Sequence, residues 1–248
     1  MRNICVEGII LKKTSYGDSD QFISIFSPQI GKIDVIAKGA RKINSHFTGH
    51  LELLNICSFE LYNKNDTYII TQCQSVRTHK PLRASLDKTG PSLLILEIFS
   101  RTATTSDHQK EFYDLMKDTL HILGKHPDSD FITEIFKIKL LKLIGALPDI
   151  KFCPTCSKKW NPGDAINIEI GGQLSCHDCK KRLNTYHDVS FNTVKLIAYI
   201  CSKNLSEILE VKINLKETRE LKKIADIFLQ LYLCEELKSE KIIASIKL

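Results

Sequence analysis

The first 80 residues alternate short apolar runs with turn residues, a pattern typical of β-strands. In GKIDVIAK, the apolar residues Ile33, Val35 and Ala37 alternate with polar ones, which indicates one buried and one solvated face. Five such runs in so short a segment favour a small closed barrel, because closure removes exposed strand edges. The five runs are ICVEGIILKK, QFISIFS, GKIDVIAK, ICSFELY and TYIITQCQSV.

From Pro91 onward the apolar residues recur at helical spacing. The simplest assembly is one helical bundle into which a cysteine-rich segment is inserted. In DFITEIFKIKLLKLIGAL, Lys139 and Lys142 share one face of the expected helix. The apolar positions expected to face the core are Ile132, Ile135, Phe136 and Leu143 in that helix, and Leu221, Ile224, Phe228, Leu231 and Tyr232 in the last helix.

The cysteine-rich segment has the spacing Cys-x2-Cys-x19-Cys-x2-Cys. Two residues between thiols let one tight turn direct both sulfur atoms at the same ion, and the second pair completes a tetrahedron. We therefore expect a structural Zn²⁺ with no open position for water. The residues between the pairs suggest a β-hairpin, and Trp160 is expected to cover the site. The predicted ligands are Cys153, Cys156, Cys176 and Cys179.

Other chemistry for these cysteines fits the sequence less well. Two disulfides need an oxidising compartment, and a redox Cys-x-x-Cys motif would use one pair. A catalytic zinc keeps three protein ligands and a water. A zinc deaminase needs a proline directly before its Cys-x-x-Cys motif, but in this sequence Phe152 precedes Cys153. The remaining cysteines, expected mostly as small buried side chains, are Cys5, Cys57, Cys73, Cys201 and Cys234.

The sequence carries no sign of a membrane span or of a familiar enzyme motif. No apolar run approaches the roughly 20 residues of a membrane helix. The apolar run at the N-terminus is short and interrupted by Glu7, so we expect a cytoplasmic protein. Neither a P-loop nor a Gly-x-Ser-x-Gly motif is present, so we expect no enzyme.

The formal charge of +6 is concentrated near the N-terminus, where residues 1–83 carry 11 Lys and Arg against 7 Asp and Glu. The loop AKGARKINSHFTGH contributes basic residues around Gly39, followed by the rings of His46 and Phe47. Cations that follow phosphates and rings that stack on bases suit single-stranded nucleic acid. A merely solvated loop is the alternative. Phe22, Phe26 and Phe59 are expected in the core rather than as stacking platforms.

The order of these features resembles that of the bacterial recombination mediator family RecO. GIILKKTSYGDSD, GKIDVIAKGARK and LELLNICSFELY resemble its N-terminal domain, while EIFKIKLLKLIGALPDIKFCPTC and GGQLSCHDC resemble its helix and zinc segment. The resemblance implies an α+β, multi-domain protein with an oligonucleotide/oligosaccharide-binding (OB) barrel at 1–80. A helical domain at 81–248 would carry a zinc ribbon-like insert at 151–182.

The resemblance also implies a function. Members bind single- and double-stranded DNA, anneal complementary strands coated by single-stranded-DNA-binding protein (SSB), and with RecR promote loading of RecA. Their helical domain docks the acidic SSB tail, for which we take Lys139 and Lys142 as candidates. Ser157 departs from the glycine usual after the first cysteine pair. The residues carried over as DNA contacts are Lys12, Lys13, Lys32, Lys38, Arg41 and Lys42.

Two other functions stay open from the sequence. The chain could be a zinc-ribbon protein–protein adaptor that does not act on DNA, in which case it would not anneal complementary strands. It could also be a metal hydrolase, in which case chelation would abolish activity without unfolding the protein. A site of four thiolates predicts that chelation unfolds the insert first.

Overall fold

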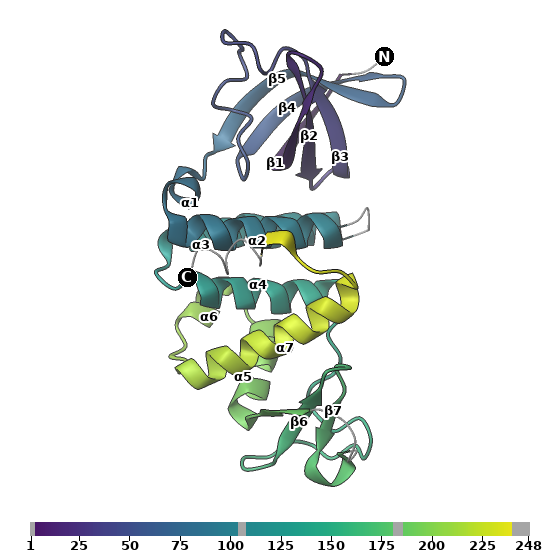
Figure 1. Cartoon of the computed structure of the whole chain (residues 1–248), viewed down its shortest axis with the longest axis vertical. Coiled ribbons are helices and arrows are strands. Elements are labelled where there is room, and N and C mark those ends of the chain that lie inside the picture. Colours follow the sequence, from purple (N-terminus) through teal and green to yellow (C-terminus); the bar gives the residue numbers. More distant parts are fainter. Residues whose placement is uncertain (1–2, 104–107, 181–185, 240–248) are drawn as a thin grey trace. The chain divides into compact units, whose positions relative to one another are not determined.

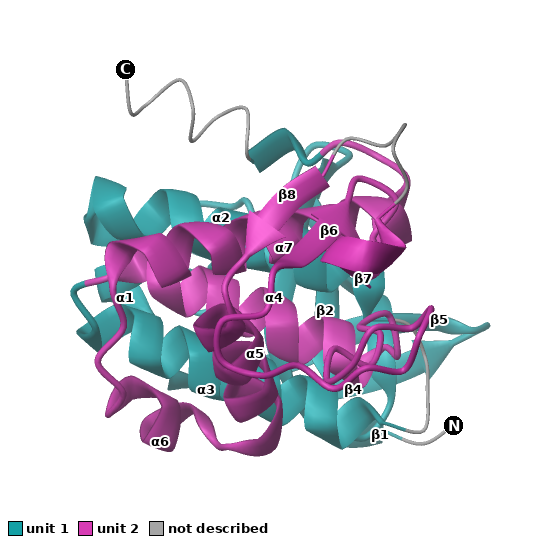
Figure 2. Cartoon of the chain, turned by 90° about the horizontal axis from the view of Figure 1, so that it is seen from below, with its two compact units in different colours: residues 1–127, 237–248 teal, residues 128–236 magenta. Residues whose placement is uncertain are grey.

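The computed structural model describes residues 3–103, 108–180 and 186–239 (Figure 1). The chain divides into two compact units, which have different colours in Figure 2. Unit 1 comprises Met1–Pro127 together with Leu237–Leu248, and unit 2 comprises Asp128–Glu236. Among the described helices, none is both long and apolar enough to cross a membrane.

Unit 1 begins with five strands, β1 (Asn3–Tyr16), β2 (Asp20–Ser27), β3 (Gly31–Ala37), β4 (Ile56–Lys64) and β5 (Thr67–Arg77). They close into a barrel in the order β1-β2-β3-β5-β4 (Figure 1). Neighbouring strands are antiparallel except β3 and β5, which are parallel. The predicted closed barrel of five strands is confirmed.

The barrel interior follows the predicted alternation of apolar and polar positions. On β3, Val35 and Ala37 are fully buried and Ile33 packs against the core, whereas Asp34 is exposed. Residues 38–55 connect β3 to β4 through a series of turns. Phe47, which we expected as a ring available to nucleic acid, is instead buried in the barrel core. Its apolar ring stabilises the fold better inside the barrel than in water.

Three helices complete the described part of unit 1 before residue 127, namely α1 (Lys80–Ala84), α2 (Leu86–Thr102) and α3 (Gln109–Lys125). The helix expected from Pro91 therefore begins five residues earlier, at Leu86. On the outer face of β2, Phe26 packs edge-on against Phe99, with ring centroids 5.0 Å apart. The hydroxyl of Tyr113 on α3 donates to Glu7 on β1 at 2.5 Å. These contacts hold the helices against the barrel.

The core prediction was right for Phe26 and Phe59 and wrong for Phe22. Phe26 and Phe59 have no exposed surface, but Phe22 is 36% exposed. Phe22 shares the outward face of β2 with Ser24 and Phe26, while Ile23 and Ile25 point into the barrel. Phe26 is buried because helices cover that end of the strand, whereas Phe22 contacts Tyr16 near the other end.

Unit 2 contains four α-helices within its described residues, α4 (Ser129–Leu143), α5 (Phe191–Ser202), α6 (Leu205–Leu209) and α7 (Leu215–Leu233). Helix α4 packs against both α5 and α7. The predicted core face of α4 is confirmed at Ile132, Ile135 and Phe136, which are fully buried. The cysteine-rich segment is inserted between α4 and α5, as the sequence predicted.

The predicted apolar stripe of α7 is only partly correct. Leu221, Ile224 and Phe228 are buried, but Leu231 is 47% and Tyr232 is 43% exposed. Gly172 lies close to Leu231, because a Cβ atom added to Gly172 would be 2.7 Å from the Leu231 side chain. This contact covers only part of Leu231. Spacing identifies the helix face, but the amount of neighbouring chain decides how much of that face is covered.

The interior of unit 2 also contains an ammonium group. Lys137 is 1% exposed and donates to Glu134 at 3.2 Å and to Asp226 on α7 at 2.6 Å. Burial raises the pKa of Glu134, and the negative charge of Asp226 raises it further. Lys137 opposes this shift, but the pKa of Glu134 still rises to about 7. Removing one partner of such a buried group leaves an uncompensated charge.

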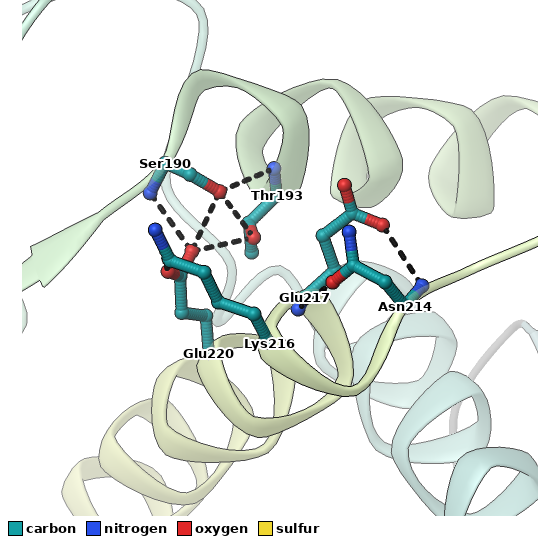
Figure 3. A network of polar contacts seen from close by, with 6 residues as sticks. All are labelled: Ser190, Thr193, Asn214, Lys216, Glu217 and Glu220. Carbon is teal, nitrogen blue, oxygen red and sulfur yellow. Dashed lines mark hydrogen bonds and ion pairs between the residues drawn. The ribbon is translucent and has the colours of Figure 1, made fainter.

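A carboxylate on α7 caps the N-terminus of α5 (Figure 3). Glu220 accepts hydrogen bonds from the Ser190 backbone N–H at 2.8 Å and from the Ser190 and Thr193 hydroxyls at 2.7 Å each. Burial alone would raise the pKa of Glu220, but these donors outweigh it and lower the pKa. Asn214 and Glu217 cap α7 itself through reciprocal hydrogen bonds (Figure 3).

The expectation that most of the remaining cysteines are buried is wrong. Cys57 is buried, Cys73 and Cys201 are half-buried, and Cys5 and Cys234 are exposed. Cys5 lies on β1 opposite Glu60 of β4, so its side chain faces outward from the barrel. The strand register decides this, because successive residues point to opposite faces.

Candidate metal centre and nucleic-acid interface

The first cysteine pair lies in a tight turn of unit 2. The Ser157 backbone N–H donates to the Cys153 carbonyl at 2.8 Å, and the Cys153 N–H donates to the Lys158 carbonyl at 2.9 Å. Ser157 adopts a left-handed conformation with φ of 61°, which favours glycine because side chains crowd the backbone there. The turn therefore forms with serine, but in a conformation that glycine would adopt at lower cost.

The second pair is delivered by a hairpin. Strand β6 (Ile166–Glu169) pairs with β7 (Leu174–Cys176), which ends at Cys176, and the short 3-10 helix His177–Cys179 positions Cys179. This confirms the predicted hairpin. A third strand, β8 (Tyr186–Val189), pairs with the free side of β6 and was not expected. Residues 181 and 182, at the end of the expected insert, lie outside the described residues.

The four sulfur atoms gather closely enough to hold one metal ion. The Sγ atoms of Cys153, Cys156, Cys176 and Cys179 all lie within 4.8 Å of one another, and those of Cys156 and Cys176 are 3.8 Å apart. A tetrahedral ion with zinc–sulfur bonds of about 2.3 Å would place its ligands about 3.8 Å apart. The donor set and spacing therefore fit a thiolate-bound ion with four protein ligands and no open position.

The surroundings of Cys153 favour its thiolate form. Burial alone would raise the pKa of Cys153, but backbone N–H groups of Cys176, Cys156 and Thr155 outweigh it and lower the pKa to about 6. By contrast, the neighbouring thiols, Cys176 first, raise the pKa of Cys179 to about 12. Four thiolates this close repel one another, and a divalent cation removes that repulsion.

Trp160 belongs to the same module. Its side chain is 4% exposed, and its indole N–H donates to the Ile150 carbonyl at 2.8 Å. The Trp160 backbone N–H bonds to the Lys151 carbonyl, two residues before Cys153. The tryptophan is thus fixed beside the tight turn that carries Cys153 and Cys156. A bound metal would stabilise the folded form of this turn.

In unit 1, the basic loop after β3 is tied to the turn between β1 and β2. The Gly39 backbone N–H donates to the Asp20 carboxylate at 2.7 Å. The Arg41 backbone N–H donates to the Ser19 carbonyl at 2.8 Å, and its guanidinium donates to the Gly17 carbonyl at 3.1 Å. These bonds place the loop at the end of the barrel where β1 finishes and β2 begins.

The six predicted DNA contacts are not equivalent in the structure. Lys12, Lys38, Arg41 and Lys42 are exposed, and the last three are brought together by the loop. Lys13 pairs with Glu52 at 3.1 Å. Lys32 is half-buried and donates to the Ser100 carbonyl near the C-terminus of α2. A positive charge at that end of a helix is favourable, which gives Lys32 a structural role.

The two lysines chosen for the SSB tail are neighbours in unit 2. Lys139 donates to the Lys203 carbonyl and Lys142 to the Cys201 carbonyl, both at 2.6 Å. Both therefore bind carbonyls at the C-terminus of α5, where positive charge is favourable. Burial lowers the pKa of Lys139, and the nearby Lys142 adds to that effect.

One feature near the basic loop was missed in the sequence. Tyr16 and Phe22 contact each other on the outer surface of the barrel, with ring centroids 4.4 Å apart. The alternation along β2 could have predicted that Phe22 faces outward, because Ile23 and Ile25 face into the barrel. Tyr16 directly precedes the Gly17 turn, a position where strand alternation alone predicts little.

Known proteins match this chain along nearly its whole length. The family model "Recombination protein O N terminal" matches residues 1–79, and "Recombination protein O C terminal" matches residues 83–241. A DNA repair protein RecO from Alkaliphilus metalliredigens (strain QYMF) is 26% identical over 231 residues, covering 93% of this chain and 94% of its own. The protein of that name from Dehalococcoides mccartyi (strain CBDB1) is 29% identical over 217 residues, covering 87% and 85%.

The two family models divide the sequence close to where the barrel ends, since β5 finishes at Arg77. The second model alone spans residues 83–241, well over half of the chain, and it includes the four-cysteine cluster. The barrel, the helices and the cysteine insert thus occur in the order that the sequence resemblance implied. The chain belongs to the recombination protein O (RecO) family of DNA repair proteins.

Proposed function

We propose that this protein is a recombination mediator that binds single- and double-stranded DNA and anneals complementary strands. The observation that carries the proposal is the exposed group of Lys38, Arg41 and Lys42 at one end of a five-stranded barrel. Small barrels of this kind bind single strands by placing cations along the phosphates. Membership of a DNA repair family supports the same function.

Annealing follows from electrostatics in this proposal. Two complementary strands repel each other through their phosphates, and exposed ammonium and guanidinium groups neutralise part of that charge. The loop is hydrogen-bonded to the β1–β2 turn, so its cations are held in place before DNA arrives. We assign Lys12 to the same surface, and we give Lys13 and Lys32 a smaller share because the Glu52 carboxylate neutralises Lys13 and Lys32 is half-buried beside α2.

The metal in this proposal is a structural Zn²⁺. Four cysteine ligands leave no position for water, so the ion stabilises the module and performs no hydrolysis. We propose that the protein is not an enzyme and acts by binding. The proposed cellular location is the cytoplasm, at the nucleoid.

The proposal includes three protein partners, namely RecR, RecA and SSB. Together with RecR, this protein would promote the loading of RecA, and it would bind the acidic tail of SSB. Lys139 and Lys142 stay our candidates for the tail. Each ammonium has three N–H donors, so the bond to a carbonyl of α5 leaves donors for a carboxylate. Charge reversal of this pair would weaken SSB-tail binding without changing binding to naked DNA.

The proposal is tested by measuring strand annealing and DNA affinity over a range of salt concentrations. About four phosphate contacts predict that the logarithm of single-strand affinity falls with the logarithm of salt at a slope of roughly −2.8. Annealing of SSB-coated strands should exceed annealing of strands coated by SSB without its acidic tail. A protein that anneals nothing and binds no oligonucleotide at low salt would instead be an adaptor that works through protein contacts alone.

A further inference from the structure

Two aromatic rings lie on the outer surface of the barrel and contact each other. The ring centroids of Tyr16 and Phe22 are 4.4 Å apart and the ring planes are inclined by 52°. Tyr16 is 49% and Phe22 is 36% exposed, although burial of an aromatic ring stabilises a fold. Two adjacent exposed rings form a surface that gains from being covered by a flat, apolar group.

The rings border the basic loop. Gly17, whose carbonyl accepts the Arg41 guanidinium, directly follows Tyr16. Tyr16 pairs with Asp20 across β1 and β2, and the Asp20 carboxylate accepts the Gly39 N–H from the loop. Because neighbouring strands lie about 4.8 Å apart, the backbones of Tyr16 on β1 and of the loop after β3 are about 10 Å apart.

We propose that Tyr16 and Phe22 form a stacking platform for unpaired bases, which makes the barrel prefer single-stranded over double-stranded DNA. This inference rests on the proposed binding of DNA by the basic loop. A single strand offers the faces of its bases to aromatic side chains, whereas in a duplex those faces are covered by neighbouring base pairs. The platform therefore contributes to the affinity for one form of DNA only.

The charges around the rings favour nucleic acid over an apolar peptide as the occupant. Lys38, Arg41 and Lys42 are exposed on the loop beside the rings. Among the acidic side chains near the rings, Asp20 is engaged by the Gly39 N–H and Asp34 by the Ser24 hydroxyl, while Asp18 is exposed in the turn. The phosphates are therefore expected on the side of Lys38 and Arg41, away from Asp18, with the bases over the rings.

The inference is tested with the full chain carrying Tyr16→Leu and Phe22→Leu together. Leucine keeps an apolar side chain of similar reach but removes the ring. We expect affinity for a single-stranded oligonucleotide to fall about tenfold to hundredfold, with duplex affinity and the salt slope unchanged. A 2-aminopurine base in the oligonucleotide, quenched on binding to the wild type, should lose that quenching.

Two matched variants serve as controls. Tyr16→Phe retains the ring and should bind single strands as the wild type does. Val76→Ala changes a residue on β5 that is 57% exposed, and it should change neither affinity. If the double variant fails to fold, Tyr16→Leu alone should weaken single-strand binding about fivefold and leave duplex binding intact.

The outcomes separate this inference from the proposed function. Unchanged single-strand affinity and unchanged quenching in the leucine variant would overturn the stacking platform while leaving DNA binding by the loop intact. Equal losses for single strands and duplex would also overturn it, because the rings would then position the loop. A wild-type protein that binds neither form of DNA would overturn the proposed function itself.

Discussion

The Arg41 guanidinium donates a hydrogen bond to the Gly17 carbonyl at 3.1 Å, joining two segments that are 24 residues apart in sequence. This bond uses part of a group with five N–H donors, so the remaining donors can still contact phosphate. The loop and the β1–β2 turn therefore act as one surface.

Charge reversal of the loop should weaken DNA binding in a salt-dependent way. In the double variant Arg41→Glu and Lys42→Glu, two phosphate contacts are lost, so the slope of log affinity against log salt should become less steep by about 1.4. Single-strand affinity should fall at least tenfold in dilute buffer. Fluorescence anisotropy with a labelled oligonucleotide over a salt series measures both quantities.

The matched control is the double variant Lys64→Glu and Lys110→Glu, which changes the net charge by the same amount as the loop variant. Both lysines are exposed residues of the same unit. That variant should keep the wild-type slope. If both double variants change the slope by the same amount, net charge alone governs binding and the loop is not the site.

Metal removal should unfold the cysteine module before it affects the barrel. Trp160 is the only tryptophan of the chain and is 4% exposed, so its fluorescence reports on this module. A strong zinc chelator, or the variant Cys156→Ser, should shift the emission to longer wavelength, because loss of a ligand exposes the indole to water. Oligonucleotide affinity measured in parallel should change less than twofold.

The order of events distinguishes a structural from a catalytic ion. Re-addition of Zn²⁺ should restore the wild-type emission, with one metal bound per chain by elemental analysis. Loss of DNA binding in step with the tryptophan signal would contradict our assignment of DNA contacts to the barrel alone.

Replacement of Ser157 by glycine should strengthen metal binding. Ser157 has φ of 61°, and a left-handed conformation costs a residue with a side chain about 1 kcal/mol. Because folding of the module is coupled to metal binding, Ser157→Gly should bind Zn²⁺ about fivefold more tightly in competition with a chelator. Ser157→Val, whose branched side chain fits this conformation poorly, should bind more weakly than the wild type.

The buried Glu134 should make unit 2 less stable as pH rises. Its pKa in the folded chain is raised to about 7, mainly by burial, so the folded state holds a proton that the unfolded chain has already released. Stability from this group is full below about pH 4.5 and is lost as pH rises through 7. The loss is on the order of 3 kcal/mol.

In the variant Glu134→Gln the side chain does not titrate, so the stability of unit 2 should not show this decline as pH rises. Urea unfolding monitored by Trp160 fluorescence at pH 5 to 8 compares the two proteins. Glu210→Gln, an exposed position in the same unit, is the control and should follow the wild type. A wild-type minus Glu134→Gln difference that is constant over this range would show that Glu134 does not titrate there.

Much of the site could be predicted because its signals are local in the sequence. The Cys-x2-Cys spacing predicts a knuckle turn, and the structure brings all four sulfur atoms within 4.8 Å of one another. The turn before Asp20 and the run AKGARK place charged residues at strand ends, and Lys38, Arg41 and Lys42 are exposed there. Alternation on β3 likewise predicted the burial of Val35 and Ala37.

The errors occur where a second element decides whether a side chain is covered. Phe22 and Phe26 have the same phase on β2, yet only Phe26 meets Phe99 of α2 and is buried. Phe47 lies in a loop but fills the barrel core. The sequence did not predict the burial of Lys137, which is made tolerable by Glu134 on its own helix and by Asp226 from α7.

The sequence by itself determined the five barrel strands, the long helices, the spacing of the four clustered cysteines and the position of the basic loop, because these depend on the periodicity and spacing of neighbouring residues. The tertiary structure alone decided which cations stay exposed, which aromatic rings face water, and that Arg41 is joined to Gly17. Such properties depend on segments far apart in the chain, whose contacts leave no local pattern in the sequence.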